Sequence, residues 1–265
     1  MRNKIAECLL IRDENHLLLE HLICNAIAGV ERFYIYDNMS RVPVSVFLTE
    51  NAPDLLPLCE IQRYEGRGNL QMDCYADQIA NHRADAEWTI FCDTDEIFEG
   101  SINDAIKTFG DRYNCLSFSP MLHGCNGHLQ RPSGGTMHDL YYDDVLDRAH
   151  HWYKVCAKTA DITFQHIHNN TMTNKRLVYL TADKYTSCVL HHYRFRSFED
   201  FLLKFQRGRA NINKGWTPHI RDFFALHKNI RPDDPEVVTL MKKYGVTIST
   251  IQVHKDYYFE QICKN

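Results

Sequence analysis

The sequence lacks any apolar stretch that approaches the roughly 18 residues of a membrane-spanning helix. It also lacks a signal-like segment at its start, because Arg2, Lys4 and Glu7 interrupt the N-terminus with charge. Neither sign of charge is in large excess, since 30 Lys and Arg residues stand against 34 Asp and Glu residues. The composition therefore gives no reason to expect nucleic acid or an anionic membrane surface as a partner, and we expect a soluble cytoplasmic protein or a soluble domain of a longer one.

Cys-x-x-Cys pairs are absent too, although the chain contains ten cysteines. Cys92 and Cys156 lie within apolar strand-like runs, which predicts reduced thiols that pack in a core. We find no internal repeat, low-complexity segment or linker. An apolar fraction of 44% is typical of a globular protein, and we expect one domain over residues 1–265.

Three carboxylates follow a short apolar strand in the stretch Trp88-Thr89-Ile90-Phe91-Cys92-Asp93-Thr94-Asp95-Glu96. In a strict strand, Asp93 and Asp95 would leave the same face. Carboxylates this close repel one another unless a cation or hydrogen-bond donors compensate them. A hard oxygen site of this kind indicates Mg2+ or Mn2+, and such ions usually hold phosphates as well. The alternative is an acidic, solvated turn, but the apolar lead-in and Glu96 favour the metal.

Hydrophobic periodicity predicts alternating strands and helices in the first third of the chain. The expected strands are 5–11, 32–36, 58–64 and 88–92, and the expected helices are 14–28, 42–50 and 70–83. In the first helix, the apolar residues at helical spacing are Leu17, Leu18, Leu22, Ile23 and Ile27. This alternation predicts an α/β fold: a mostly parallel sheet with helices on both faces and a ligand crevice at the carboxyl ends of the strands.

The second half of the chain is less regular. We expect strands at 154–160, 162–168 and 186–192, and helices at 101–109, from 198 onward, at 220–227 and at 236–244. Ser101 and Ser197 are the predicted N-caps of two of these helices. Residues 120–150 are rich in Gly, His and Asp, and we expect a long loop that orders over substrate.

Several segments carry a combination that is more specific than any one motif. They are Ile11-Arg12-Asp13-Glu14 with Leu18-Leu19-Glu20-His21, residues 29–38, Gln71 and Tyr75, residues 88–98, and the block His192-Tyr193, Arg196-Ser197, Phe201 and Arg207-Gly208. Together they resemble nucleotide-sugar glycosyltransferases of the Rossmann-like GT-A fold, most closely family 92 and its family-2-like relatives. The departures are Met39 where Gly is frequent, His191 where Asn is common and Arg196 where Lys is usual.

The resemblance implies a metal-dependent glycosyltransferase. It would move a sugar from a nucleoside-diphosphate sugar, with uridine diphosphate as the expected nucleotide, to a glycan or lipid-linked hydroxyl acceptor, with inversion. Residues 1–110 would bind the nucleotide-sugar. Residues 111–265 would form the acceptor side and the C-terminal segment that closes on the metal and diphosphate.

The resemblance also implies roles for single residues. Asp95 would bind Mn2+ or Mg2+, and Asp93 would bind the metal or the ribose of the donor. His192 would complete the metal site and favour Mn2+, with His166 and His168 as competitors for that role. Asp37 would accept a hydrogen bond from the nucleobase. The full donor-binding set would be Arg12, Glu14, Asp37, Gln71, Asp93, Thr94 and Arg207.

An inverting transfer needs a carboxylate near the acceptor hydroxyl as general base. The acids in the loop region are Asp139, Asp143, Asp144 and Asp147, of which we take Asp144 as the representative candidate. Glu96 is the other candidate, although it could equally orient its neighbours.

Two other functions stay open. A phosphoaspartyl phosphohydrolase also carries Asp-x-Asp after an apolar strand and uses Mg2+, but there the motif normally follows the first strand. A non-catalytic carbohydrate-binding protein that keeps the fold would bind sugars without donor turnover.

Overall fold

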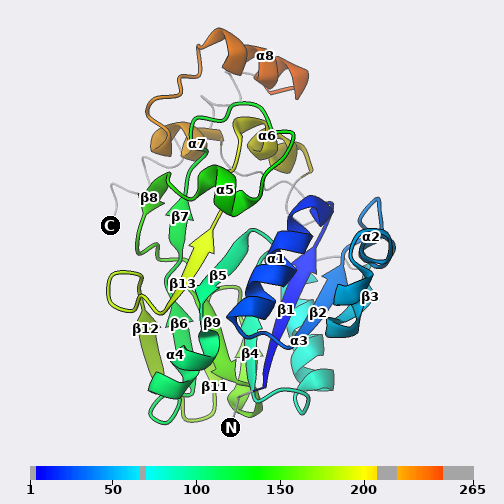
Figure 1. Ribbon diagram of the computed structural model, residues 1–265, viewed down its shortest axis with the longest axis vertical. Helices are drawn as coiled ribbons and strands as arrows, with labels where there is room; N and C mark the ends of the chain where they lie inside the picture. The colour runs from blue at the N-terminus through cyan, green and yellow to red at the C-terminus, as the bar shows by residue number, and fades with distance from the viewer. Residues whose placement is uncertain (1–3, 66–69, 208–219, 247–265) are drawn as a thin grey trace. The chain divides into compact units, whose positions relative to one another are not determined.

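The computed structural model describes residues 4–65, 70–207 and 220–246 (Figure 1). A seven-stranded sheet has the order β12-β6-β9-β4-β1-β2-β3. Its strands are β1 Ile5–Ile11, β2 Arg32–Asp37, β3 Cys59–Arg63, β4 Trp88–Phe91, β6 Cys115–Phe118, β9 Lys154–Lys158 and β12 Leu177–Leu180. Every neighbouring pair is parallel except those of β9, which runs antiparallel to both β4 and β6. The predicted mostly parallel sheet is therefore confirmed.

Helices cover both faces of this sheet. Alternate residues of a strand point to opposite faces. Phe33 of β2 joins the buried core with Leu22 of α1, which spans Asn15–Ala28. The next residue but two, Tyr36, donates its hydroxyl proton to Asp77 of α3 (Leu70–His82) over 2.7 Å. Strand β1 is buried along its whole length, as a strand between two helical layers must be. The α/β fold class is thus as the sequence predicts.

The remaining elements form two smaller sheets and several further helices. A second sheet has the order β5-β13-β7-β8, with β5 Glu96–Gly100, β7 Met121–His123, β8 Val145–Asp147 and β13 Cys188–His192. A two-stranded ribbon pairs β10 (Ile162–Gln165) with β11 (Asn170–Met172). The other helices are α2 Val44–Asn51, α4 Ile102–Phe109, α5 Met137–Tyr141, α6 Phe198–Arg207, α7 Ile220–Leu226 and α8 Pro235–Lys243, with 3-10 turns at Pro53–Leu58 and Thr159–Asp161.

The chain divides into two compact units. The first unit comprises residues 1–122 and 147–194 and contains the seven-stranded sheet. The second unit comprises residues 123–146 and 195–265. Its core is aromatic: the ring of Phe223 lies 4.8 Å from that of Phe198, 5.3 Å from that of Phe201 and 4.1 Å from that of His227. Within the described part of the chain, no helix has the length and apolar character that crossing a membrane requires.

Residues 120–150 differ from the predicted long loop, because β7, α5 and β8 lie within them. Helix α5 begins with a capping box: the Thr136 hydroxyl accepts from the Asp139 backbone N–H at 3.0 Å, and the Asp139 carboxylate accepts from the Thr136 N–H at 3.3 Å. The spacing of these two residues was a legible helix signal. The predicted N-caps are confirmed, since Ser101 accepts from Asp104 N–H and Ser197 from Asp200 N–H.

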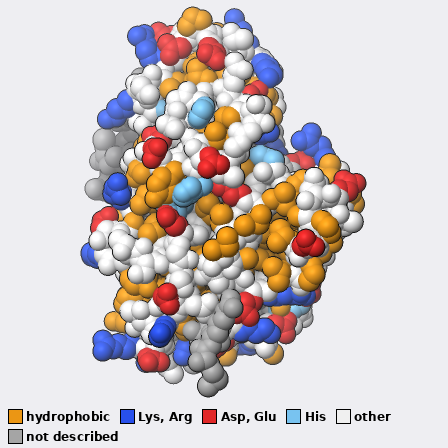
Figure 2. Space-filling model, viewed as in Figure 1, with side chains coloured by type: hydrophobic (Ala, Val, Ile, Leu, Met, Phe, Trp, Pro, Cys, Tyr) orange, Lys and Arg blue, Asp and Glu red, His pale blue; other side chains and the backbone are white. Residues whose placement is uncertain are grey.

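Two residues of α1 lie differently from the sequence prediction, and Met39 has an unusual backbone conformation. Ile23 and Ile27 do not belong to the inward face of α1, because they are 46% and 80% exposed, and Figure 2 shows apolar side chains gathered on this part of the surface. Met39 adopts a φ of +53°, in the left-handed region that favours glycine. This conformation explains why glycine is frequent at that position in the family that the sequence resembles.

A fully buried polar network joins β1, α1 and β5. The Glu7 carboxylate lies 2.5 Å from His21 Nε2 and accepts from the Asn25 amide at 2.8 Å. The Asn25 carbonyl oxygen in turn accepts from the Phe98 backbone N–H at 2.9 Å. Burial opposes the charged imidazole, but the Glu7 carboxylate outweighs it and raises the pKa of His21. The network thereby fixes β5, the strand that begins at Glu96, against helix α1.

We expect Glu7→Ala to lower the free energy of unfolding by about 3–5 kcal/mol, because the change leaves the buried His21 and Asn25 without their partner. Urea unfolding measures this loss. Glu50→Ala, which removes an exposed carboxylate from α2, is the matched control and should change stability little. A loss below about 1 kcal/mol for Glu7→Ala would contradict a stabilising role of the network.

Candidate active site at the carboxyl end of β4

The acidic segment lies in a turn rather than in a strand. Strand β4 ends at Phe91 and β5 begins at Glu96, so the first acids follow the strand as predicted. The same-face arrangement that a continuous strand would give Asp93 and Asp95 does not apply, because both lie in the turn. Antiparallel pairing of β13 with β5 places His192 opposite Glu96, and the Tyr193 backbone N–H donates to the Asp95 carbonyl oxygen at 2.8 Å. The turn is therefore tied to the end of β13, a strand that lies far away in the sequence.

Asp93 is held by two donors. Lys154 Nζ lies 2.7 Å from its Oδ2, and the Gln71 amide donates to its Oδ1 at 2.9 Å. The side chain is still 37% exposed, so part of the carboxylate faces solvent. Burial opposes its charge, but the Lys154 ammonium outweighs this and lowers the pKa of Asp93. Asp93 is thus a fixed, ionised and accessible carboxylate.

Glu96 is fully buried. Its Oε2 accepts from the Asp93 backbone N–H at 2.9 Å and lies 3.0 Å from Lys154 Nζ. Burial raises the pKa of Glu96 to about 8, against the opposing effect of Lys154. A carboxylate with these partners and no exposure orients its neighbours, which favours the second of the two roles that the sequence suggests for Glu96.

Asp95 and His192 form the second pair of the site. Asp95 Oδ1 lies 3.6 Å from His192 Nε2, and Glu96 Oε1 lies 3.7 Å from His192 Nδ1. Both separations exceed a hydrogen bond. Two ligands that are each about 2.1 Å from one ion lie about 3–4 Å apart, so the Asp95–His192 distance suits a shared cation. Glu96 Oε1 is a buried oxygen without a hydrogen-bond partner in the described chain. A carboxylate and imidazole donor set of this kind fits Mn2+.

Other predicted donor-binding residues lie at the ends of neighbouring strands. The Thr94 hydroxyl donates to Glu14 at 2.6 Å, and both side chains are buried. The Asp37 carboxylate accepts from the backbone N–H groups of Ser40 and Val44 at 2.9 and 3.1 Å, so it fixes its own turn and the start of α2. Arg12 is half-buried after β1. The donor-binding roles of Asp37 and Arg12 stay predictions.

Lys154 is a residue of this site that the sequence did not predict. It is the first residue of β9, lies fully buried and makes ion pairs with two acids of the site. A signal was present, because a lysine that opens the otherwise apolar run Lys154-Val155-Cys156-Ala157 is seldom buried without a partner. The identity of that partner was not legible, since Asp93 lies 61 positions away.

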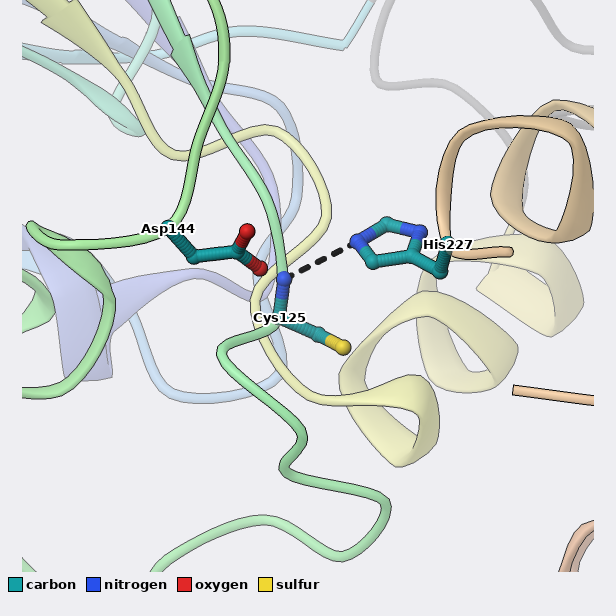
Figure 3. A group of neighbouring side chains, drawn as sticks. All are labelled: Cys125, Asp144 and His227. Atoms are coloured by element: carbon teal, nitrogen blue, oxygen red, sulfur yellow. Dashed lines mark hydrogen bonds between the residues drawn. The ribbon is translucent and has the colours of Figure 1, made fainter. Parts of the chain in front are cut away.

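The second unit contains a separate polar cluster (Figure 3). Among the described residues, Cys125, Asp144 and His227 are three side chains whose potential metal-ligating atoms all lie within 4.8 Å of one another. However, His227 Nε2 accepts from the Cys125 backbone N–H at 2.9 Å, and its Nδ1 lies 2.7 Å from the Phe223 carbonyl oxygen. Burial raises the pKa of the Cys125 thiol to about 11. A neutral ring whose nitrogens are both engaged, beside a protonated thiol, describes a hydrogen-bonded cluster.

Asp144 belongs to this cluster, where it accepts from the Asn126 backbone N–H at 2.7 Å. Arg207 is the last residue of α6, and the Gly208 that follows it lies outside the described residues. Asp144 and Arg207 belong to the second unit, and their roles stay predictions.

The two other histidines proposed as metal ligands lie in the first unit. His166 is exposed, whereas His168 is half-buried and its Nδ1 lies 3.3 Å from the Tyr153 carbonyl oxygen. Burial and the charge of Lys154 lower the pKa of His168 to about 4. The side chain of His168 is therefore a neutral imidazole in the electrostatic range of the acidic site.

No family model matches the sequence. Among solved structures, the chain is similar to residues 1–349 of Staphylococcus aureus TarS in complex with UDP, with a TM-score of 0.45, 16% identity and coverage of 77% of this chain and 63% of that one. It is also similar to GalNAc-T7 with UDP, GalNAc and Mn2+, with a TM-score of 0.44, 10% identity and coverage of 98% and 58%.

In sequence, the chain is similar to a glycosyltransferase family 92 protein of Ricinus communis, to which it is 25% identical over 222 residues. The match covers 79% of this chain but spans only 38% of the length of the relative. This similarity agrees with the motif resemblance, and over most of its length the chain is similar in sequence to a glycosyltransferase of family 92.

Proposed function

We propose that this protein is a metal-dependent glycosyltransferase that transfers a sugar from a nucleoside-diphosphate sugar, in the first instance a uridine diphosphate sugar, to a hydroxyl group of a glycan or lipid-linked acceptor. The observation that carries the proposal is the 3.6 Å approach of Asp95 Oδ1 to His192 Nε2 beside the exposed carboxylate of Asp93. An oxygen and a nitrogen ligand at this spacing, at the carboxyl end of a central strand, suit a cation that holds a diphosphate. Similarity to a family 92 protein supports the same reaction.

In this proposal, Asp95 and His192 hold the ion, with Mn2+ preferred because imidazole suits it better than Mg2+. The bound ion would neutralise the diphosphate and so help it to leave. Asp93 would accept a hydrogen bond from the donor on its exposed side, while Gln71 and Lys154 hold its two oxygens from the buried side. Thr94, held by Glu14, would fix the turn between the two acids.

The acceptor hydroxyl needs a base that takes its proton as the anomeric carbon is attacked from the side opposite the leaving group. Because Glu96 is fully buried, we propose Asp144 for this role, with Asp139, Asp143 and Asp147 of the same segment as alternatives. Inversion of the anomeric centre is part of the proposal, as are the donor-binding roles of Arg12, Glu14, Asp37 and Arg207.

A screen of donor hydrolysis over a set of nucleotide-sugars, with and without Mn2+, tests the proposed function. We expect metal-dependent release of one nucleoside diphosphate, uridine diphosphate first, because ion and diphosphate share the site. Release of inorganic phosphate from phosphomonoesters would instead indicate a phosphoaspartyl phosphohydrolase. Sugar binding without turnover of any donor would indicate a carbohydrate-binding protein.

A further inference from the structure

Lys154 is a cation that the fold places permanently inside the acidic site. Its side chain is fully buried, and its Nζ lies 2.7 Å from Asp93 Oδ2 and 3.0 Å from Glu96 Oε2. An ammonium group without exposure is stable only when anions compensate it. The two carboxylates at these distances supply that compensation, so the ammonium keeps its charge inside the site.

The ammonium group of Lys154 compensates negative charge of the carboxylates that would otherwise attract a metal ion. The segment from Asp93 to Glu96 carries three acids, and Lys154 pairs with two of them. The remaining acid, Asp95, lies with its Oδ1 3.6 Å from His192 Nε2. At an effective dielectric constant of about 20, a unit charge several ångström from a divalent ion changes the affinity for that ion by roughly tenfold or more.

We propose that Lys154 is a built-in counter-ion of this site, which keeps Asp93 and Glu96 compensated without metal and thereby weakens the affinity of the site for a divalent cation. The inference rests on the proposed function, because it concerns the same site. Its consequence is that the site binds a cation firmly only when the diphosphate of a donor adds further negative charge. A site of this kind releases its ion readily once the nucleotide has left.

The charge-neutral variant Lys154→Met tests this inference, because methionine keeps the length of the side chain and removes its charge. We expect the Kd for Mn2+, measured by isothermal titration without nucleotide, to fall by about tenfold or more. The melting temperature of the metal-free variant should fall at the same time, because Asp93 and the buried Glu96 lose their cation. If Lys154 were only a structural residue, the variant would bind Mn2+ equally or more weakly, and that result would overturn the proposal.

A second pair of variants keeps the test decisive if Lys154→Met does not fold. Asp93→Asn removes the ionised partner of Lys154 and leaves the ammonium, so it should bind Mn2+ more weakly than the parent. The double variant Lys154→Met/Asp93→Asn removes one charge of each sign and should bind Mn2+ more tightly than Asp93→Asn alone. An equal or weaker affinity of the double variant than of Asp93→Asn would overturn the proposal as well.

Lys158→Met is the matched control. Lys158 lies at the other end of β9, with its Nζ 5.7 Å from the centre of the Trp88 ring, so the variant makes the same change in net charge away from the acids. Its Kd for Mn2+ should equal that of the parent. Failure of the parent and of every variant to bind Mn2+ would overturn the proposal. The expected order of affinities without turnover of any nucleotide-sugar would support it and would refute the proposed transferase activity instead.

Discussion

Asp95→Asn is expected to lower metal-dependent donor turnover by about a thousandfold, which corresponds to ~4 kcal/mol of transition-state stabilisation. The physical reason is that the change removes the charge of the carboxylate nearest His192, the pair to which we assign the ion. Initial rates of nucleoside diphosphate release at saturating Mn2+ measure the effect. The same variant should not unfold the metal-free protein, because it removes one charge from a segment of mutually repelling acids.

Asp54→Asn is the control for this prediction. Asp54 is exposed in the 3-10 turn before β3, so its replacement makes the same chemical change away from the site. Its turnover should match that of the parent. If Asp95→Asn turned over donor as fast as the parent at the same Mn2+ concentration, the assignment of Asp95 to the ion would be wrong.

His192→Ala is expected to weaken Mn2+ binding by about 10- to 100-fold, because it removes the nitrogen that lies 3.6 Å from Asp95 Oδ1. His191→Ala is the closest control that the chain offers. His191 is the preceding residue of β13, points to the other face of the strand and pairs with Glu99 at 2.9 Å. Metal titration of both variants should show a loss for position 192 alone.

The competing ligands are tested in the same titration. We expect His166→Ala and His168→Ala to retain most of the affinity, because His166 is exposed and His168 is engaged near the Tyr153 carbonyl oxygen. A large loss at His168 with none at His192 would move the metal ligand from β13 to the segment after β10.

Local pattern carried the sequence predictions that succeeded. The four strands of the first third and their helices follow from runs and periods of apolar residues. These patterns reflect which side chains of each element face the protein core and which face water. The N-caps at Ser101 and Ser197 follow from side chains that satisfy free backbone N–H groups within three residues. Strands β5, β6 and β12 escaped prediction, because their sequences show no clear alternation of apolar and polar residues. The exposure of Ile23 and Ile27 escaped as well, because spacing on a helix does not say which side is covered.

The sequence by itself determined that this protein has an α/β fold and that three acids, Asp93, Asp95 and Glu96, follow a core strand. Their proximity is a covalent fact, and their mutual repulsion already required a compensating partner. Only the tertiary structure decided which partner each acid has. Pairing of β13 with β5 brings His192 to Asp95, and the antiparallel β9 carries Lys154 beneath Asp93 and Glu96. Such contacts depend on strand order and register, which are set by the packing of the whole sheet and leave no mark on the local sequence.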